Sequence, residues 1–159
     1  MSSQAKIVSV EEAQKQVQAW KSEGLQIVFT NGCFDILHLG HVDYLEKSSG
    51  LGDKLVLGLN TDQSVSAIKG ENRPLQNQLS RSRVIAALTF VDLVVLFDES
   101  TPRALIESIV PNILVKGDDY EIKNIVGADF VLANGGKVET VSLVTGYSTT
   151  SVVNKILKK

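Results

Sequence analysis

Short apolar runs alternate with amphipathic segments along most of this chain. The runs over 25–30, 54–60 and 93–97 have the length and composition of strands that are buried on both faces. The segments between them carry apolar residues at helical spacing. Because strands and helices that alternate in this way form parallel sheets with right-handed crossovers, we expect an α/β fold. The arrangement is expected to be Rossmann-like, with three α/β/α layers and a mostly parallel sheet.

Capping residues indicate where the helices begin. Ser9 and Glu12 fit a capping box before a helix over 10–22, whose apolar stripe packs on the rest of the domain. Further helices are expected up to 68 and over 41–49, 81–89, 102–110 and 152–157, with Ser80, Thr101 and residues 148–151 as caps. The remaining strands are expected over 112–116, 129–133 and 137–142, the last two around the turn 134–136.

Length, charge and cysteine content narrow the class of protein. The 159 residues suffice for one domain with a substantial core, so we expect a single domain over 1–159, with residues 1–24 forming an N-terminal helix packed on it. A net charge of −2 gives no general attraction to nucleic acid or to an anionic membrane. The single cysteine excludes an internal disulfide and suits a reducing cytoplasm, and no apolar run is long enough to span a bilayer. We therefore expect a cytoplasmic protein that binds neither nucleic acid nor membranes.

The stretch over 30–41 reads Thr-Asn-Gly-Cys-Phe-Asp-Ile-Leu-His-Leu-Gly-His and joins an expected strand to an expected helix. It contains both histidines of the chain, His38 and His41, whose spacing places them on one face of a first helical turn. Gly40 between them leaves room for a ligand to approach. Ligands of open α/β sheets bind at the carboxyl ends of strands, against helix N-termini. The stretch therefore predicts an anion site, although a solvated loop is the commoner setting for a histidine.

A metal site is the alternative use of two close histidines. No set of cysteine, histidine and carboxylate residues completes a zinc site here, and Asp35 is the only close carboxylate. Three other polar clusters follow strands or begin helices, over 69–73, 116–120 and 146–151. Because the carboxyl ends of parallel strands share one rim of the sheet, we expect these clusters to converge with the histidine stretch.

His-x-Gly-His after a strand, with Gly-x-Phe-Asp upstream, resembles the signature of the cytidylyltransferase-like nucleotidyltransferase superfamily. The wider Thr-Asn-Gly-Cys-Phe-Asp wording and Val-Lys-Gly-Asp-Asp-Tyr over 115–120 are similar to the branch that adenylylates D-glycero-β-D-manno-heptose 1-phosphate. The resemblance covers about 25–157. It implies an enzyme that transfers AMP from ATP to the sugar 1-phosphate, giving ADP-heptose for lipopolysaccharide core synthesis and releasing pyrophosphate.

The resemblance also implies roles for individual residues. Both histidines would support the pentacoordinate phosphorus, and Lys69 would act with them as a catalytic cation. The nucleotide-binding residues would be Thr30, Gly32, Cys33, Phe34, Gly40, Lys116, Gly117, Asp119, Tyr120, Ser148, Thr149 and Thr150. The sugar phosphate would be bound by Asp35, Arg73 and Arg81. Asp35 has two further readings, as an orienting group and as a carboxylate at a helix entry, and solvation is the alternative for the loop cations.

One departure from the superfamily concerns the segment before the last helix. The glycerol-phosphate branch has an arginine there, whereas residues 144–147 of this chain read Val-Thr-Gly-Tyr. Another cation must then make that phosphate contact. Mg²⁺ is expected with ATP, held mainly by phosphates and water, and we name no protein ligand for it. The resemblance further implies a homodimer or higher homo-oligomer and a separate sugar kinase acting upstream.

Two other functions remain open at this point. One is a cytidylyltransferase that acts on glycerol 3-phosphate or a phosphorylated amino-alcohol. The other is a nucleotide-binding module without turnover, against which the intact pair His38 and His41 argues.

Overall fold

Six parallel strands form one sheet in the order β1-β4-β3-β2-β5-β6 in the computed structural model, which describes residues 2–157. The strands are β1 (Ile7–Val8), β2 (Ile27–Gly32), β3 (Lys54–Asn60), β4 (Leu93–Phe97), β5 (Ile113–Gly117) and β6 (Lys137–Val141). From β2 the chain proceeds to β3 and β4 on one side, and β5 and β6 lie on the other side. The carboxyl ends of β2 and β5 therefore form the switch point at which α/β sheets bind ligands.

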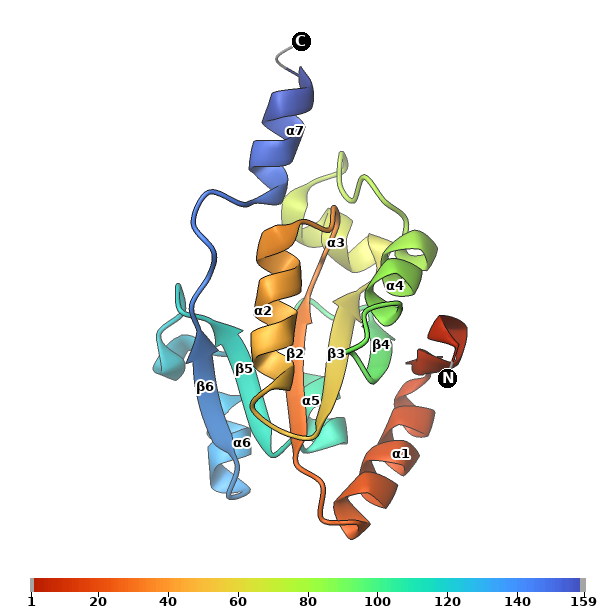
Figure 1. Ribbon diagram of the computed structural model, residues 1–159, viewed down its shortest axis with the longest axis vertical. Coiled ribbons are helices and arrows are strands. Elements are labelled where there is room, and N and C mark those ends of the chain that lie inside the picture. Colours follow the sequence, from red (N-terminus) through yellow and green to blue (C-terminus); the bar gives the residue numbers. More distant parts are fainter. Residues whose placement is uncertain (1, 158–159) are drawn as a thin grey trace.

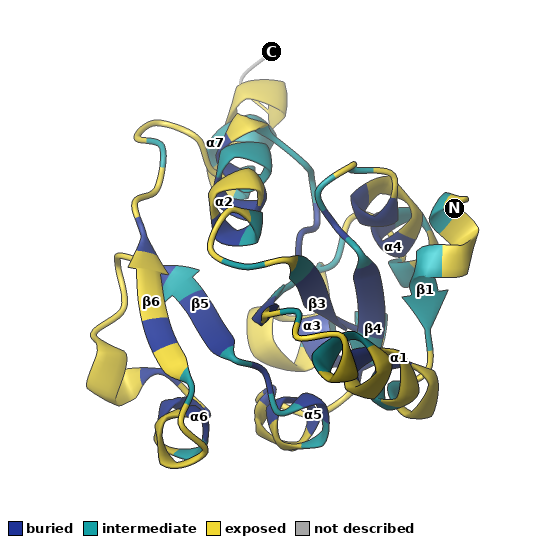
Figure 2. Ribbon diagram, turned by 60° about the horizontal axis from the view of Figure 1, so that its bottom comes forward, coloured by how far each residue is buried: buried dark blue, intermediate teal, exposed yellow. Residues whose placement is uncertain are grey.

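Helices cover both faces of this sheet (Figures 1 and 2). They are α1 (Val10–Ser22), α2 (Leu39–Ser49), α3 (Asp62–Lys69), α4 (Gln78–Ala86), α5 (Arg103–Ile109), α6 (Ala128–Ala133) and α7 (Thr149–Leu157), with 3-10 turns over Ser3–Lys6 and Ile122–Asn124. Apolar side chains of α1, α5 and α6 pack with Phe29 and Leu114 in one core. Those of α2 and α4 pack with Leu57 and Val115 in a second core on the other face. The expected three-layer α/β/α fold is confirmed, and the sheet is entirely parallel.

The strand expected over 129–133 is wrong, because this segment is the helix α6. Ala128 and Val131 are buried, whereas Leu132 is exposed, which is the spacing of a helix face. β6 pairs with β5 in parallel, and a parallel pair requires a crossover connection between its strands. The helix supplies that crossover, where two strands around the turn 134–136 were expected.

Several boundaries differ from the expected ones. β2 spans Ile27–Gly32, so it begins and ends two residues later than the expected strand over 25–30. α4 begins at Gln78 with Asn77 as its cap instead of Ser80, and α5 begins at Arg103, with Pro102 at the cap position instead of Thr101. The capping box of Ser9 and Glu12 is confirmed. No helix within residues 2–157 combines the length and apolar character needed to cross a membrane.

Candidate active site

A cleft of about 620 Å³ opens at the carboxyl ends of β2 and β5. Its walls are the turn 31–41, the end of α3 with the loop after it, the end of β5 and the segment 143–150 that leads into α7. The expected site residues that line it are Gly32, Cys33, Phe34, Asp35, His38, Gly40, His41, Lys69, Arg73, Lys116, Gly117, Asp119, Tyr120, Ser148, Thr149 and Thr150. The structure thus brings together four clusters that lie far apart in sequence.

The two histidines form the centre of the cleft. His38 occupies the N-cap position of α2, and His41 lies in the first turn of that helix. Their imidazole rings stack with centroids 3.8 Å apart and planes inclined by 20°. A side chain at Gly40 would place its Cβ atom 3.1 Å from the His38 ring and 3.3 Å from Tyr147, which explains the glycine between the histidines.

Burial keeps these rings neutral near pH 7. It lowers the pKa of His38. It also lowers the pKa of His41 to about 4, and positive charge on His38 and Lys69 adds to the effect. The Nδ1 atoms of both rings are buried and have no hydrogen-bond partner within the described chain. The pair is therefore a set of uncharged groups at a helix N-terminus, which a bound anion can turn into charged donors.

Phe34 fixes the position of His41 from the preceding turn. Its backbone has a φ of 44°, a left-handed conformation that is uncommon for a bulky residue. Its buried ring meets the His41 ring edge-on, with centroids 5.1 Å apart. The same ring lies over Gly32, where a Cβ atom would come within 2.7 Å of it. Gly32 is therefore needed for close approach of the phenylalanine to the strand end.

Asp35 is buried and binds the loop after α3. Burial alone would raise the pKa of its carboxyl group, but the backbone N–H groups of Gln76 and Leu75 and the guanidinium of Arg73 outweigh burial and lower it. The carboxylate is thus ionised and fully engaged with protein groups. Lys69, at the end of α3, is exposed and lines the cleft.

Lys116 lies at the end of β5, on the opposite wall. Its ammonium group donates to the backbone and side-chain oxygens of Asn31, and it lies 5.9 Å from the ring centroid of Tyr120. Burial lowers the pKa of Lys116 to about 8. An anion in the cleft would therefore find a lysine that is charged at pH 7 and poorly hydrated.

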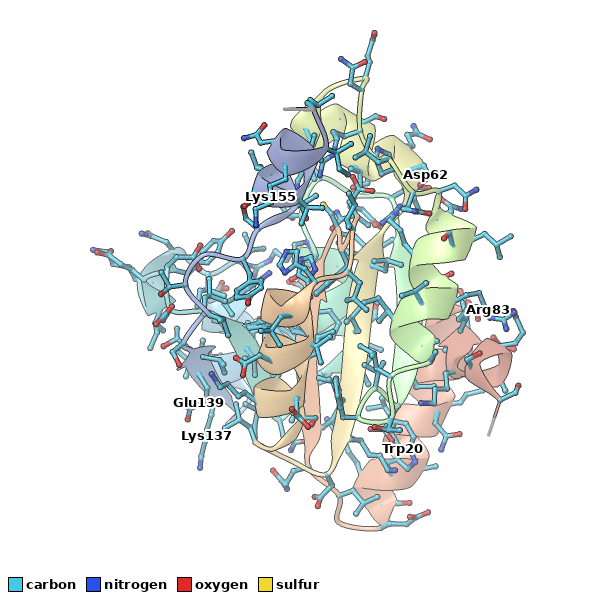
Figure 3. All side chains as sticks on the ribbon, turned by 45° about the horizontal axis from the view of Figure 1, so that its top comes forward. Trp20, Asp62, Arg83, Lys137, Glu139 and Lys155 are labelled. Atoms are coloured by element: carbon cyan, nitrogen blue, oxygen red, sulfur yellow. The ribbon has the colours of Figure 1, made fainter. Side chains whose placement is uncertain are left out.

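The hydroxyl cluster lies where the helix α7 begins. The Ser148 side chain accepts a hydrogen bond of 3.0 Å from the Ser151 backbone, as an N-cap residue does. Helix α7 starts at Thr149, three residues before the expected start, so Thr149 and Thr150 lie in its first turn. In Figure 3 the labelled Lys155 marks α7 at the same end of the molecule as Asp62. The cleft thus lies between the N-termini of two helices, α2 and α7.

Two expected site residues do not line the cleft. Thr30 is buried in β2, where its hydroxyl bonds to the Tyr44 hydroxyl at 2.7 Å and donates to the backbone oxygen of Val115. Arg81 is buried in α4. Its guanidinium donates to the backbone oxygens of Cys33, Asn60 and Gln76 and to the Asp62 carboxylate. Arg81 therefore joins the motif turn to β3 and α3 in this structure, and its expected role at the sugar phosphate stays a prediction.

Several lining residues were not expected from the sequence, namely Asn31, Tyr44, Leu143, Val144 and Tyr147. Asn31 lies within the motif over 30–41 and Tyr44 lies shortly after it, so closeness to the motif was the one sequence signal that could have identified them. The three residues of the 143–147 segment form a largely apolar wall suited to a base or sugar face. Nothing in their spacing distinguishes them from an ordinary loop.

No group of three or more histidine, cysteine or carboxylate residues within 2–157 is arranged to hold a metal ion. Asp35 is already occupied by the loop, and Asp119 is the other carboxylate that lines the cleft.

Comparisons with known proteins identify relatives of this chain. The chain is 55% identical over 149 residues to the bifunctional protein HldE of Azorhizobium caulinodans and 51% identical over 156 residues to that of Geobacter metallireducens. It covers 31% and 32% of those proteins, so it spans about a third of their length. These alignments take in 94% and 98% of this chain.

Two solved structures resemble the fold. A lipopolysaccharide core biosynthesis protein from Thermoplasma volcanium is 30% identical with a TM-score of 0.60, over 79% of this chain and 100% of that one. A pantoate-beta-alanine ligase from Francisella tularensis, 17% identical with a TM-score of 0.62 over 96% of this chain and 78% of that one, shares the fold. Residues 29–153 match the family described as Cytidylyltransferase-like, from within β2 into α7. This chain therefore belongs to the cytidylyltransferase-like family.

Proposed function

We propose that this domain is a nucleotidyltransferase that transfers AMP from ATP to D-glycero-β-D-manno-heptose 1-phosphate. One observation carries the proposal: His38, His41 and the start of α7 meet in a single cleft with Lys69, Arg73 and Lys116. Such a site is built to hold several phosphates at once. The heptose branch is supported by the motif wording over 30–41 and 115–120. The Thermoplasma volcanium relative, described as a lipopolysaccharide core biosynthesis protein, fits the same branch.

The reaction needs positioning more than covalent help from the protein. An oxygen of the sugar 1-phosphate attacks the α-phosphorus of ATP in line, so an O–P bond forms as the bond to the β-phosphate oxygen breaks. Pyrophosphate leaves with the electron pair, and no proton has to move. Charge grows on the equatorial oxygens and on the leaving group, and a fixed set of donors stabilises it.

The residues divide between these tasks according to where they lie. His38 and His41 donate to phosphate oxygens at the N-terminus of α2, while Ser148, Thr149 and Thr150 bind the triphosphate at the N-terminus of α7. Lys69 and Arg73, from the loop wall, neutralise the phosphates, and Lys116 approaches from β5. Mg²⁺ bound to the nucleotide would screen the remaining phosphate charge.

Release of pyrophosphate is the test. The protein is incubated with Mg²⁺, ATP or CTP, and heptose 1-phosphate or glycerol 3-phosphate. We expect release only with ATP and heptose 1-phosphate, and losses of about 100-fold or more in His38→Ala and in His41→Ala, as for removal of one charge-stabilising donor. Preference for CTP, or release that is unchanged in both variants, contradicts the proposal. Binding of ATP without turnover would indicate a nucleotide-binding module.

A further inference from the structure

The carboxylate of Asp35 is the point at which the loop after α3 is tied to the motif turn. Its Oδ2 accepts a hydrogen bond from Arg73 Nε at 2.7 Å, the Leu75 amide lies 2.9 Å from both oxygens, and the Gln76 amide lies 2.9 Å from Oδ1. Only 1% of the side chain is exposed. A buried, ionised carboxylate with these donors has no donor of its own to offer a phosphate and would repel one.

Arg73 is held on one side only. Its Nε belongs to the pair with Asp35, and within residues 2–157 no hydrogen-bond partner is found for its two terminal nitrogens. The side chain lines the cleft and is one-fifth exposed, at 20%. A guanidinium fixed at Nε still presents a planar edge of two nitrogens, which matches two oxygens of a phosphate.

Few other contacts hold this loop. The Ser66 hydroxyl donates to the Arg73 backbone oxygen at 2.5 Å, and the Arg73 amide donates to Gly70 at 3.0 Å. Gly70 has a φ of 96°, and a Cβ atom there would touch nothing within 4 Å. The segment 70–76 therefore leaves α3 through an open, left-handed glycine and returns to the body at Asp35.

We propose that Asp35 is a positioning residue that fixes the segment 70–76 and aims the free edge of Arg73 at the sugar phosphate. The left-handed turn at Phe34 links this arrangement to the histidines, because Phe34 contacts His41 while the next residue holds the loop. The turn at Phe34 and Asp35 therefore sets the distance between the histidines, which act at the α-phosphorus, and Arg73, which binds the acceptor phosphate. This inference rests on the proposed function and decides which of the readings of Asp35 holds.

The test separates a positioning role from direct contact and from a merely structural role. Asp35→Asn keeps the size and one acceptor for the amides, but it turns an NH₂ group toward Arg73 Nε. We expect kcat/KM for heptose 1-phosphate to fall by about 10- to 100-fold, the range for losing a charged hydrogen bond. Arg73→Gln should give a similar fall, carried mainly by KM.

The double variant shows whether Asp35 and Arg73 act together. If Asp35 acts through Arg73, then Asp35→Asn combined with Arg73→Gln is little worse than the poorer single variant. Losses that multiply would mean that Asp35 acts independently of Arg73, and would overturn the proposal.

Asp92→Asn is the matched control. Asp92 also binds a cation and a backbone amide, with Lys54 Nζ at 3.0 Å and the Leu55 amide at 2.9 Å. Lys54 lies over Trp20, which Figure 3 labels at the end of the molecule away from Asp62. This control removes a comparable charged pair at a more exposed position, where 28% of the Asp92 side chain is accessible, so it should lose less stability than Asp35→Asn and keep its kcat/KM. An equal loss of activity in both would indicate general destabilisation and contradict a specific role for Asp35.

Amide exchange measures the tie without any turnover. In the free protein, Asp35→Ala should speed exchange at Leu75 and Gln76 by about tenfold or more and leave the sheet unchanged. Unchanged exchange at these two amides overturns the positioning role.

If the wild type releases no pyrophosphate with any substrate pair, the proposed function fails. The double-variant comparison is then made on the binding of inorganic phosphate, which stands for the acceptor phosphate; additive losses overturn the inference and non-additive losses support it.

Discussion

The imidazole rings of His38 and His41 lie face to face, with centroids 3.8 Å apart. Two positive charges at this separation repel strongly, and burial opposes even one of them. The pair is therefore neutral in the free protein near pH 7. A bound polyphosphate supplies the negative charge that would favour protonation, so the site is adapted to an anion more than to a cation.

Acid should destabilise the protein through His41. The pKa of this group falls from an ordinary 6.5 to about 4 on folding, because the ring is buried. Between these values the unfolded chain binds a proton that the folded chain does not, so stability rises with pH across this window and is lost as the pH falls from 6.5 toward 4. The loss amounts to about 3 kcal/mol. Urea unfolding at pH 7, 5.5 and 4 measures it.

His41→Asn is the control for this pH dependence, since asparagine does not titrate. Its stability should vary less between pH 6.5 and 4 than that of the wild type. An equal slope in both proteins would assign the acid sensitivity to other groups. Cacodylate and Bis-Tris, which both buffer near pH 6 and differ in ionisation enthalpy, should also give different apparent heats of ATP binding at that pH, because proton uptake accompanies binding.

Gly32→Ala should impair the chemistry more than the fold. The added methyl group would lie 2.7 Å from the Phe34 ring, which has to move. Since that ring contacts His41, the displacement reaches the histidine pair. We expect a cost of about 1–3 kcal/mol in stability, as for overpacking, and a fall in kcat of about tenfold or more. Pyrophosphate release and thermal unfolding measure the two effects.

Gly50→Ala serves as the matched control for this substitution. Gly50 caps α2 with a φ of −68°, and an added Cβ atom would meet only ordinary contacts of 3.5 Å or more. Its stability should change by less than about 1 kcal/mol, with no change in activity. If Gly32→Ala behaves in the same way, the Phe34 ring does not hold His41 in place.

The sequence predicts those features that depend on local pattern. The buried strand 54–60 and the capping box at Ser9 are read directly from apolar runs and cap chemistry, and both are confirmed. The segment 129–133 was wrongly predicted as a strand, because five residues are too few to distinguish a strand from a helix by periodicity. Only the parallel pairing of β5 with β6 decides it, and that pairing is tertiary.

The cleft was predictable as far as it follows strand ends. His38, Lys116 and Ser148 come at such ends or at helix starts, and the parallel topology brings them together. Arg81 could not be placed in this way. A cation at a helix start is typical of a phosphate site, but the carbonyl groups of Cys33 and Asn60 that bind this one come from remote segments. A single sequence does not show which remote carbonyl groups will accept hydrogen bonds from a buried arginine.

Affinity for ATP should depend on the charge of Lys116. Burial lowers the pKa of this lysine to about 8, so it is charged at pH 7 and loses its proton as the pH rises through 8. ATP binding should therefore weaken by up to about tenfold between pH 7.5 and 9. In Lys116→Met, binding should be weaker at pH 7 and should vary less over this range. Calorimetric titration with Mg-ATP provides the measurement.

Lys137→Met is a suitable control, because Lys137 is exposed at the start of β6, at the end of the sheet away from the cleft (Figure 3). This variant should retain the affinity and the pH dependence of the wild type. A wild-type pH profile in Lys116→Met would show that this lysine does not contact the nucleotide.

Arg81 should contribute to stability and not to substrate affinity. Its buried guanidinium satisfies three backbone oxygens and the Asp62 carboxylate, which Arg81→Met would leave without their donor. We expect a loss of about 3 kcal/mol in urea unfolding, since unpaired buried polar groups are costly. In Arg81→Lys, which keeps the charge but not the fork of donors, the folded protein should retain its KM for heptose 1-phosphate within about threefold, because the side chain is buried and does not line the cleft. Arg83→Met provides the comparison. Among residues 2–157 the Arg83 guanidinium bonds to Gln4 and Ser3 at the surface and to no other side chain, so its loss should change stability by about 0.5 kcal/mol or less. A tenfold rise in KM with unchanged stability in Arg81→Lys would instead place Arg81 at the sugar phosphate, as the family resemblance implies.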